Sequence, residues 1–173
     1  MKRPPKPFYF DAKLLATTRQ GKEDKAEVEL LDALVRHDRT VEVLKTAYSG
    51  VLLVKTALRP EEALRAVKSM EMAYVEHVFP IHEVVEADLR ALREACLKLA
   101  REVGLRPGLK FAVRCRRRGR AVRSSVEVER ALGQAIREAT GAEVDLEEPD
   151  VVFRIEVIGD VAGICLLREG RRT

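Results

Sequence analysis

The sequence contains no tryptophan and no asparagine, and aromatic residues make up only 5% of its 173 positions. No apolar run approaches the ~20 residues that a membrane-spanning helix needs. The N-terminal stretch MKRPPKPFYF is basic, but prolines and charged residues stand where a secretion signal has its apolar region. We therefore expect a cytoplasmic protein without a membrane segment.

Side-chain amides are scarce while charged residues reach 35% of the chain. This composition is typical of heat-adapted organisms, so we expect a thermophile as the source. Apolar residues make up 46% of the sequence, which excludes wholesale disorder and supplies the core of one domain or of two small ones.

Only three cysteines are present, Cys96, Cys115 and Cys165, and they lie far apart in apolar surroundings. No CxxC pair occurs, and no histidine stands at ligand spacing from any of them. The pattern predicts small buried side chains and no zinc site. It leaves open whether any two of the cysteines pair.

Motifs that hold nucleotide cofactors are also absent: no GxGxxG turn follows a predicted strand, and no P-loop occurs. The H-x-E and P-C-x-x-C motifs of nucleobase deaminases are missing. His77 and His82 flank the stretch VFPI, where a period of two places them on opposite sides of a strand. The acidic stretch 145–150 lacks the ligand order of a calcium loop and is interpreted as a turn. We expect no catalytic residue, no metal, no cofactor and no enzymatic activity in this chain.

What the sequence has in excess is positive charge in one place. The formal net charge is +4, yet residues 110–123, here called the basic segment, carry +7 without an acidic residue, and residues 124–167 carry −7. The cations of the basic segment are Lys110, Arg114, Arg116, Arg117, Arg118, Arg120 and Arg123. The planar guanidinium group suits bidentate contact with phosphates, so nucleic acid is the favoured partner. The alternative is that the following carboxylates fold back and pair with the arginines.

The first half of the chain predicts a β-α-β-β-α-β order, which is the ferredoxin-like pattern. Alternating apolar residues indicate strands and apolar residues three and four apart indicate helices. The predicted elements are a strand from Asp11, a helix within 22–38, strands at 40–46 and 51–57 that turn at Ser49-Gly50, a helix at 60–70 and extended chain at 73–87. We assign residues 8–85 to an N-terminal ferredoxin-like domain.

The second half predicts an α/β unit over residues 88–168, with flexible basic tails at 1–7 and 169–173. Asp88 is the expected N-cap of a helix that ends at Gly104. A strand at 109–119 follows, then a helix that ends at Gly141 and a hairpin that turns at Gly159-Asp160. Because the second hairpin strand is apolar on both faces, we expect it inside the sheet.

The strand at the start of the basic segment has a period of two, so its residues divide between two faces. One face holds Leu109, Phe111, Val113 and Cys115, and the other holds Lys110, Ala112, Arg114 and Arg116. Ser124 and Glu127 fit a capping box at the start of the following helix. Free N–H groups at such a helix start bind phosphate oxygens, so Ser124 and the arginines indicate one site for an anionic ligand.

Three stretches of the second half together resemble a THUMP domain, an RNA-binding module of tRNA-modifying proteins. They are FAVRCRRRG, SSVEVERALGQAI and GAEVDLEEPDVVFRIEVIGDVAGI. The first half adds LLATTRQGKEDKAEVEL, AYSGVLLVKTA and HVFPIHEVVEADL, which resemble the N-terminal part of the stand-alone THUMP adaptors of tRNA cytidine acetyltransferases. In that family the adaptor binds tRNA and a separate enzyme forms N4-acetylcytidine.

The resemblance implies an α/β (α+β) protein with an N-terminal ferredoxin-like domain and a THUMP domain, whose partners are tRNA and a tRNA-modifying enzyme. It places the RNA-binding residues in the basic segment, at Lys110, Arg114, Arg116, Arg117, Arg118, Arg120 and Arg123, and Ser124 follows them directly. No aromatic residue lies among the arginines, so recognition is expected to depend on the RNA backbone and its shape.

Three classes of function follow from these observations. The favoured one is a non-catalytic adaptor that presents tRNA to a cytidine acetyltransferase or, alternatively, an RNA-binding subunit of another tRNA-modifying enzyme. The second is a protein-interaction scaffold whose arginines meet an acidic partner. The third is a small-molecule sensor in the ferredoxin-like half with the basic strand as its effector surface.

Overall fold

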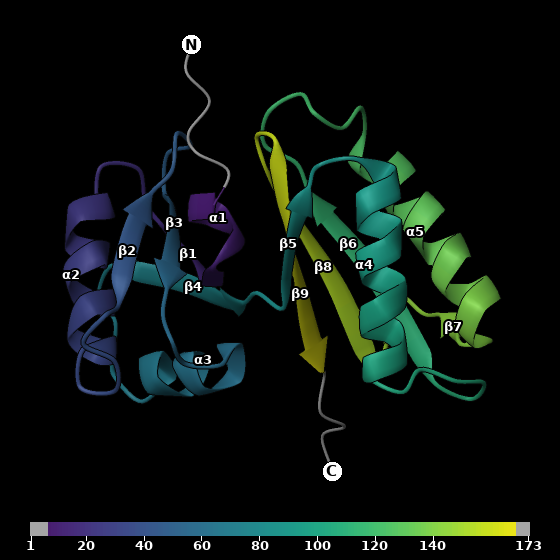
Figure 1. Ribbon diagram of the computed structural model, residues 1–173, viewed down its shortest axis with the longest axis horizontal. Coiled ribbons are helices and arrows are strands. Elements are labelled where there is room, and N and C mark those ends of the chain that lie inside the picture. Colours follow the sequence, from purple (N-terminus) through teal and green to yellow (C-terminus); the bar gives the residue numbers. More distant parts are fainter. Residues whose placement is uncertain (1–6, 169–173) are drawn as a thin grey trace. The chain divides into compact units, whose positions relative to one another are not determined.

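The computed structural model describes residues 7–168 and divides the chain between His82 and Glu83 into two compact units, here called the first and the second unit (Figure 1). The predicted flexible tails lie outside the described residues, apart from Pro7. No helix within residues 7–168 is long and apolar enough to cross a membrane.

The first unit is an antiparallel sheet with helices. Its elements are α1 (Pro7–Phe10), β1 (Ala12–Thr18), α2 (Glu23–Leu34), β2 (Glu42–Lys45), β3 (Val51–Lys55), α3 (Pro60–Lys68) and β4 (Val75–Pro80). The strand order is β2-β3-β1-β4, and every neighbouring pair is antiparallel. After the short α1, this is the predicted ferredoxin-like order, which is thereby confirmed.

The core of the first unit forms between its sheet and its two longer helices. Leu14 of β1 and Leu52 of β3 are fully buried together with Leu30 and Leu34 of α2. These residues follow a period of two in the strands and three to four in the helix, as the sequence predicts.

The predicted turn at Ser49-Gly50 is present and requires glycine. Gly50 has φ +73°, and a Cβ atom there would lie 2.3 Å from the carbonyl oxygen of Thr18. The Gly50 amide donates to the Glu23 carboxylate at 2.8 Å, and the Thr18 amide donates to the Gly50 carbonyl at 2.9 Å. A side chain at this position would therefore disturb the join between β1 and the β2–β3 hairpin.

The second unit is a mixed sheet with two long helices. Its elements are β5 (Glu83–Glu86), α4 (Leu89–Glu102), β6 (Lys110–Arg116), α5 (Ser125–Thr140), β7 (Glu143–Val144), β8 (Val151–Ile158) and β9 (Val161–Arg168). The order is β5-β9-β8-β6-β7, and β6 runs parallel to both of its neighbours. Strand β9 lies inside the sheet, as predicted. Figure 1 shows α4 and α5 side by side on one face of this sheet, over the core.

The extended chain predicted over 73–87 is not one strand, and this expectation is corrected. Residues 75–80 form β4 in the first sheet, whereas Glu83–Glu86 form β5, which pairs with β9. Residues 83–85, assigned from the sequence to the first domain, therefore pair in the second sheet. An alternating pattern indicates extended chain but not which strand it pairs with, and so the division was not visible in the sequence.

Candidate nucleic-acid interface

Strand β6 carries the first part of the basic segment and has the two predicted faces. Phe111 and Val113 are buried in the core, where the Phe111 ring meets Phe153 edge to face with centroids 6.1 Å apart. Lys110, Arg114 and Arg116 are exposed. The alternation of the strand thus confirms the predicted register, with the small Ala112 buried on the second face.

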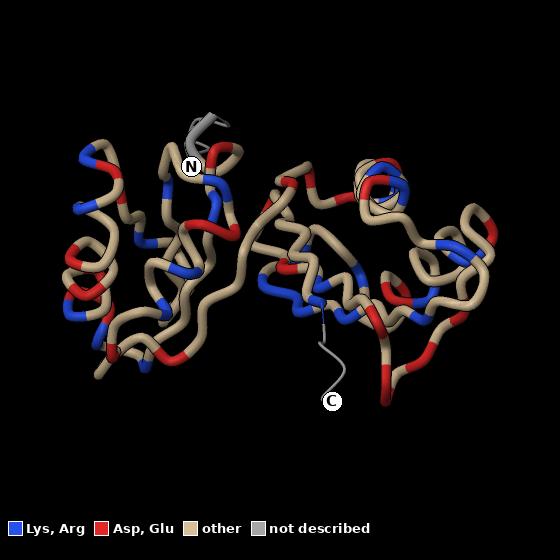
Figure 2. Tube along the Cα trace, turned by 90° about the horizontal axis from the view of Figure 1, so that it is seen from below, with Lys and Arg blue, Asp and Glu red and all other residues tan. Residues whose placement is uncertain are grey.

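Strand β8 adds two charged residues beside β6 that sequence reasoning missed. The parallel register places Arg154 next to Arg114 and Glu156 next to Arg116. In Figure 2 several of the blue Lys and Arg positions of the second unit fall close together. The period of two in VVFRIEV assigns Arg154 and Glu156 to one face, but only the pairing of β8 with β6 brings that face to the basic segment.

Beyond β6 the chain forms a loop at residues 117–124, here called the exit loop, which leads into α5. The Arg117 side chain donates to the carbonyl oxygens of Val122 at 3.2 Å and Arg123 at 2.6 Å. The main chain of Arg118 bonds to β8 and its turn, through Val157 at 3.1 Å and Gly159 at 3.0 Å. Val122 is buried and packs against the core. The exit loop is therefore folded around two of its own arginines.

Arg118 does not point to solvent, although the sequence placed it among the RNA-binding residues. Its guanidinium lies 2.6 Å from Oε2 of Glu156, and the two side chains are 9% and 0% exposed. Arg154 Nε donates to the other carboxylate oxygen of Glu156 at 2.5 Å. A fully buried carboxylate needs partners that compensate for the lost water, and at Glu156 two hydrogen-bonded arginines provide this compensation. Arg118 thus belongs to a buried ion pair inside the second unit.

Two further predicted residues have contacts within the second unit. Lys110 forms an ion pair with Asp145 at 3.2 Å, and Arg114 donates to the carbonyl of Leu146 at 3.1 Å. The expected turn over 145–150 is present, since the Asp145 carboxylate accepts from the amides of Glu147 and Glu148. These amides and Lys110 hold the pKa of Asp145 below its usual value. The alternative predicted from the sequence, in which the carboxylates that follow pair with the basic segment, therefore holds at Lys110 and Arg118.

Three arginines of the basic segment have side chains with neither an ion pair nor a hydrogen bond among residues 7–168, whereas Arg114 and Arg117 bond to main-chain carbonyls. Arg116, Arg120 and Arg123 are exposed, and none of their side chains forms an ion pair with the rest of residues 7–168. Ser124 ends the exit loop as the N-cap of α5, and its Oγ accepts from the Glu127 amide at 3.3 Å. This bond is the serine half of the predicted capping box. Arg123 therefore stands immediately before a helix start, where the positive potential of the helix end adds to its charge.

The cysteines offer no chemistry at this surface. All three are free thiols; Cys96 and Cys165 are buried as predicted, whereas Cys115, also predicted to be buried, is only half-buried. Burial raises the pKa of Cys96 to about 12 and also raises the pKa of the half-buried Cys115. Within the described part of the chain, no group of three or more His, Cys, Asp and Glu side chains could hold a metal ion.

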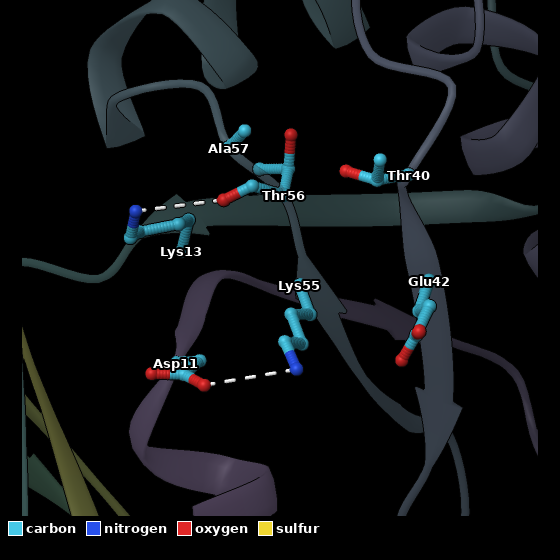
Figure 3. Close-up of a pocket in the computed structure, with 7 residues that line it drawn as sticks. All are labelled: Asp11, Lys13, Thr40, Glu42, Lys55, Thr56 and Ala57. Carbon is cyan, nitrogen blue, oxygen red and sulfur yellow. Dashed lines mark hydrogen bonds and ion pairs between the residues drawn. The ribbon is translucent and has the colours of Figure 1, made fainter.

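A pocket of about 340 Å³ lies in the first unit (Figure 3). It is lined by Asp11, Lys13, Thr40, Glu42, Lys55, Thr56 and Ala57. Lys55 lies 3.7 Å from the Asp11 carboxylate, and Lys13 donates to the carbonyl of Thr56 at 3.5 Å. With two lysines and two carboxylates the pocket has no excess of positive charge, so it favours a phosphate group less than the basic segment does.

Comparison with known proteins agrees with this geometry. Residues 86–167 match the family model of the THUMP domain. The chain is 34% identical over 126 residues to a tRNA sulfurtransferase of Azotobacter vinelandii, covering 71% of this chain and 26% of that protein. It thus spans about a quarter of this curated relative.

Two solved structures resemble most of the chain. PH1313 from Pyrococcus horikoshii superposes with a TM-score of 0.72 at 25% identity, over 92% of this chain and 56% of that one. TrmN from Thermus thermophilus superposes with a TM-score of 0.62 at 29% identity, over 90% of this chain and 45% of that one. The second half of this chain, residues 86–167, is therefore a THUMP domain, preceded by a four-stranded antiparallel sheet.

Proposed function

We propose that this protein binds tRNA with the THUMP domain and that the exit loop, together with the exposed face of β6, forms the contact surface. The observation that carries the proposal is the set of three exposed arginines, Arg116, Arg120 and Arg123, left without ion pairs among the described residues. Clustered cations without partners disfavour the folded state unless an anionic ligand neutralises them. The tRNA named for the curated relative is a ligand of that chemistry.

The mode of recognition follows from the side chains that the surface offers. Arginine forks and the N-terminal amides of α5 bind phosphate oxygens. No aromatic residue lies between Arg114 and Ser125, so bases have no ring to stack on in this stretch. We therefore expect the protein to recognise the backbone and shape of a folded RNA, with Arg114 adding a contact through the guanidinium nitrogens that Leu146 does not occupy.

We further propose that the protein acts as a non-catalytic adaptor that presents tRNA to a modifying enzyme, in particular a cytidine N4-acetyltransferase. The resemblance of the first half to the adaptors of that enzyme supports this partner. An adaptor raises the rate by bringing substrate and enzyme together, which is a proximity effect. The names of the curated relatives favour a second candidate, a subunit that serves sulfur transfer to tRNA.

A binding experiment tests the first step of this proposal. Folded tRNA, unfolded tRNA and double-stranded DNA are compared at one salt concentration in a gel-shift assay. We expect the tightest binding to folded tRNA. Equal binding to all three would show a charged surface without RNA selectivity and would contradict the proposed tRNA binding. Selective binding to an acidic protein would instead favour the protein-interaction scaffold.

Mass spectrometry of nucleosides tests the adaptor step. Incubated with tRNA and acetyl-coenzyme A, the protein alone should leave tRNA unchanged. With a cytidine acetyltransferase it should raise the yield of N4-acetylcytidine. A tRNA sulfurtransferase assayed in parallel tests the second candidate, a subunit that serves sulfur transfer. Modified nucleoside from this protein alone would overturn the adaptor in favour of an enzyme.

A further inference from the structure

The arginines of the exit loop have two different environments. The side chains of Arg117 and Arg118 bond within the second unit: the exposed Arg117 bonds to main-chain carbonyls of the loop, and the nearly buried Arg118 bonds to Glu156. Arg120 and Arg123 are exposed. The loop therefore combines two arginines whose side chains bond to the protein with two whose side chains have no such bond and can meet a ligand.

Glu156 is central to the contacts of Arg118. Its carboxylate is fully buried and bonds on one oxygen to Arg118 and on the other to Arg154. Arg118 lies near the end of β6, and its main chain also bonds to Val157 and Gly159. A single acidic residue of β8 thus holds the first turn of the exit loop by its side chain, at the point where β8 leads into its hairpin.

We infer that Glu156 is a positioning residue of the RNA interface: it never touches the ligand, but by holding Arg118 it fixes the exit loop so that Arg120 and Arg123 are presented with Arg116 at the end of β6. This inference rests on the proposed tRNA binding. Like charges in a short loop repel one another and favour spread conformations. A loop held in its binding conformation before the ligand arrives avoids that ordering cost during binding.

Net charge alone predicts the opposite effect of a substitution at Glu156. Replacing Glu156 by glutamine removes one negative charge from an anion-binding unit, and a purely electrostatic surface would bind tRNA more tightly. If Glu156 positions the loop, the same substitution weakens binding. A matched control is Glu148→Gln, which removes one negative charge from an exposed residue of the second unit.

Because Glu156→Gln leaves two arginines with a neutral partner in the interior, the single variant is at risk of not folding. The double variant Glu156→Gln with Arg118→Met avoids this problem. It removes the buried pair as a whole, which is often neutral for stability, and the introduced glutamine side chain keeps an oxygen for Arg154. The net charge of the double variant equals that of the native protein, so a change in affinity cannot come from net charge.

The test measures tRNA affinity, the melting temperature and amide hydrogen exchange of residues 117–123 in the native protein, the double variant and Glu148→Gln. We expect the double variant to melt like a folded protein, to exchange faster in the exit loop and to bind tRNA about five- to tenfold more weakly. Glu148→Gln should bind as tightly as the native protein or slightly more tightly.

A folded double variant with native affinity and native exchange in the exit loop would overturn the inference while leaving the proposed function intact. If the native protein does not bind tRNA, the proposed function fails, and with it the role of Glu156 in RNA binding. The exchange measurement still distinguishes the two parts in that case, because unchanged protection of residues 117–123 in the double variant would show that Glu156 does not hold the loop.

Discussion

The two units contain comparable strand-to-helix connections that differ in how they treat charge. In the first unit residues 19–22 join β1 to α2, and α2 begins with Glu23 and Asp24. Arg19 of that connection pairs with Glu76 at 3.3 Å. In the second unit the longer exit loop joins β6 to α5, contains four arginines and leaves Arg120 and Arg123 exposed without ion pairs among the described residues.

The difference supports the proposed ligand site at the start of α5. Both connections lead from the carboxyl end of a strand to the positive end of a helix, which is a common place for anion binding in α/β proteins. Acidic residues in the first turn of α2 satisfy that potential from within the chain. At α5 only Glu127 stands in the first turn, and Arg120 and Arg123 precede the helix, so this end favours an external anion. If the proposed function holds, the same local geometry serves structure in one unit and recognition in the other.

The largest effect is expected from a substitution that destabilises the first unit but not the second. Gly50→Ala combines a φ of +73° with a Cβ atom 2.3 Å from Thr18 O, and should destabilise the first unit by at least about 3 kcal/mol. The second unit has its own core, so its amides should keep their protection and tRNA binding should persist. Hydrogen exchange resolved by segment measures both.

The control for this prediction is Gly21→Ala. Gly21 has φ +87°, but a Cβ atom there meets nothing within 4 Å, so the cost should be only about 1–2 kcal/mol of backbone strain. Equal loss of protection in both units of Gly50→Ala would show that the two cores do not fold separately.

A second prediction contrasts the two faces of β6. Phe111→Ala should cost about 3–5 kcal/mol of stability, because the ring is fully buried against Phe153. Arg116→Ala should change the stability by less than about 0.5 kcal/mol and should weaken tRNA binding. Chemical unfolding and a binding assay on both variants decide the matter. If Arg116→Ala destabilised the protein as much as Phe111→Ala, the assigned register of β6 would be wrong.

A third prediction concerns a carboxylate that serves structure in the first unit. Hydrogen bonds from Thr40, Thr56 and the Ala57 amide hold the pKa of Asp38 well below its usual value. A lowered pKa in the folded state gives stability that is present above the ordinary aspartate pKa of about 3.9 and is lost as the pH falls below it. Asp38→Asn should therefore show a smaller loss of stability between about pH 5 and pH 2.5 than the native protein. Urea unfolding at several pH values measures this loss, and equal losses would exclude the assigned role.

The smallest effect is expected at Gly133, inside α5. Glycine within a helix costs about 0.8–1 kcal/mol relative to alanine. A Cβ atom at Gly133 would lie 3.9 Å from Val144 Cγ2, which is ordinary contact. Gly133→Ala should therefore stabilise the second unit by about 0.5–1 kcal/mol and leave tRNA affinity unchanged. A lower melting temperature would show that α5 packs more closely on β7 than this distance indicates.

Most elements could be predicted from the sequence because their signals are local. The periods of the strands and helices, the Ser124 cap and the glycine turns at Gly50 and Gly141 depend on neighbours within a few residues. The partner of β5 and the position of Arg118 depend on β9 and β8, far along the chain. A run of arginines shows the amount of charge, whereas the burial of Arg118 against Glu156 depends on the pairing of β6 with β8.

The central claim is that tRNA binding is carried by the exposed arginines of the second unit, and the dependence of affinity on salt tests it most directly. The slope of log affinity against log salt is about −0.7 to −0.9 for each phosphate neutralised. Arg116, Arg120 and Arg123 replaced together by alanine should make the slope shallower by about 2–3. A matched triple variant in the first unit, at the exposed Lys22, Arg36 and Arg39, changes the net charge equally and should keep the native slope. A native slope near zero, or the same reduction in both triple variants, would contradict the account.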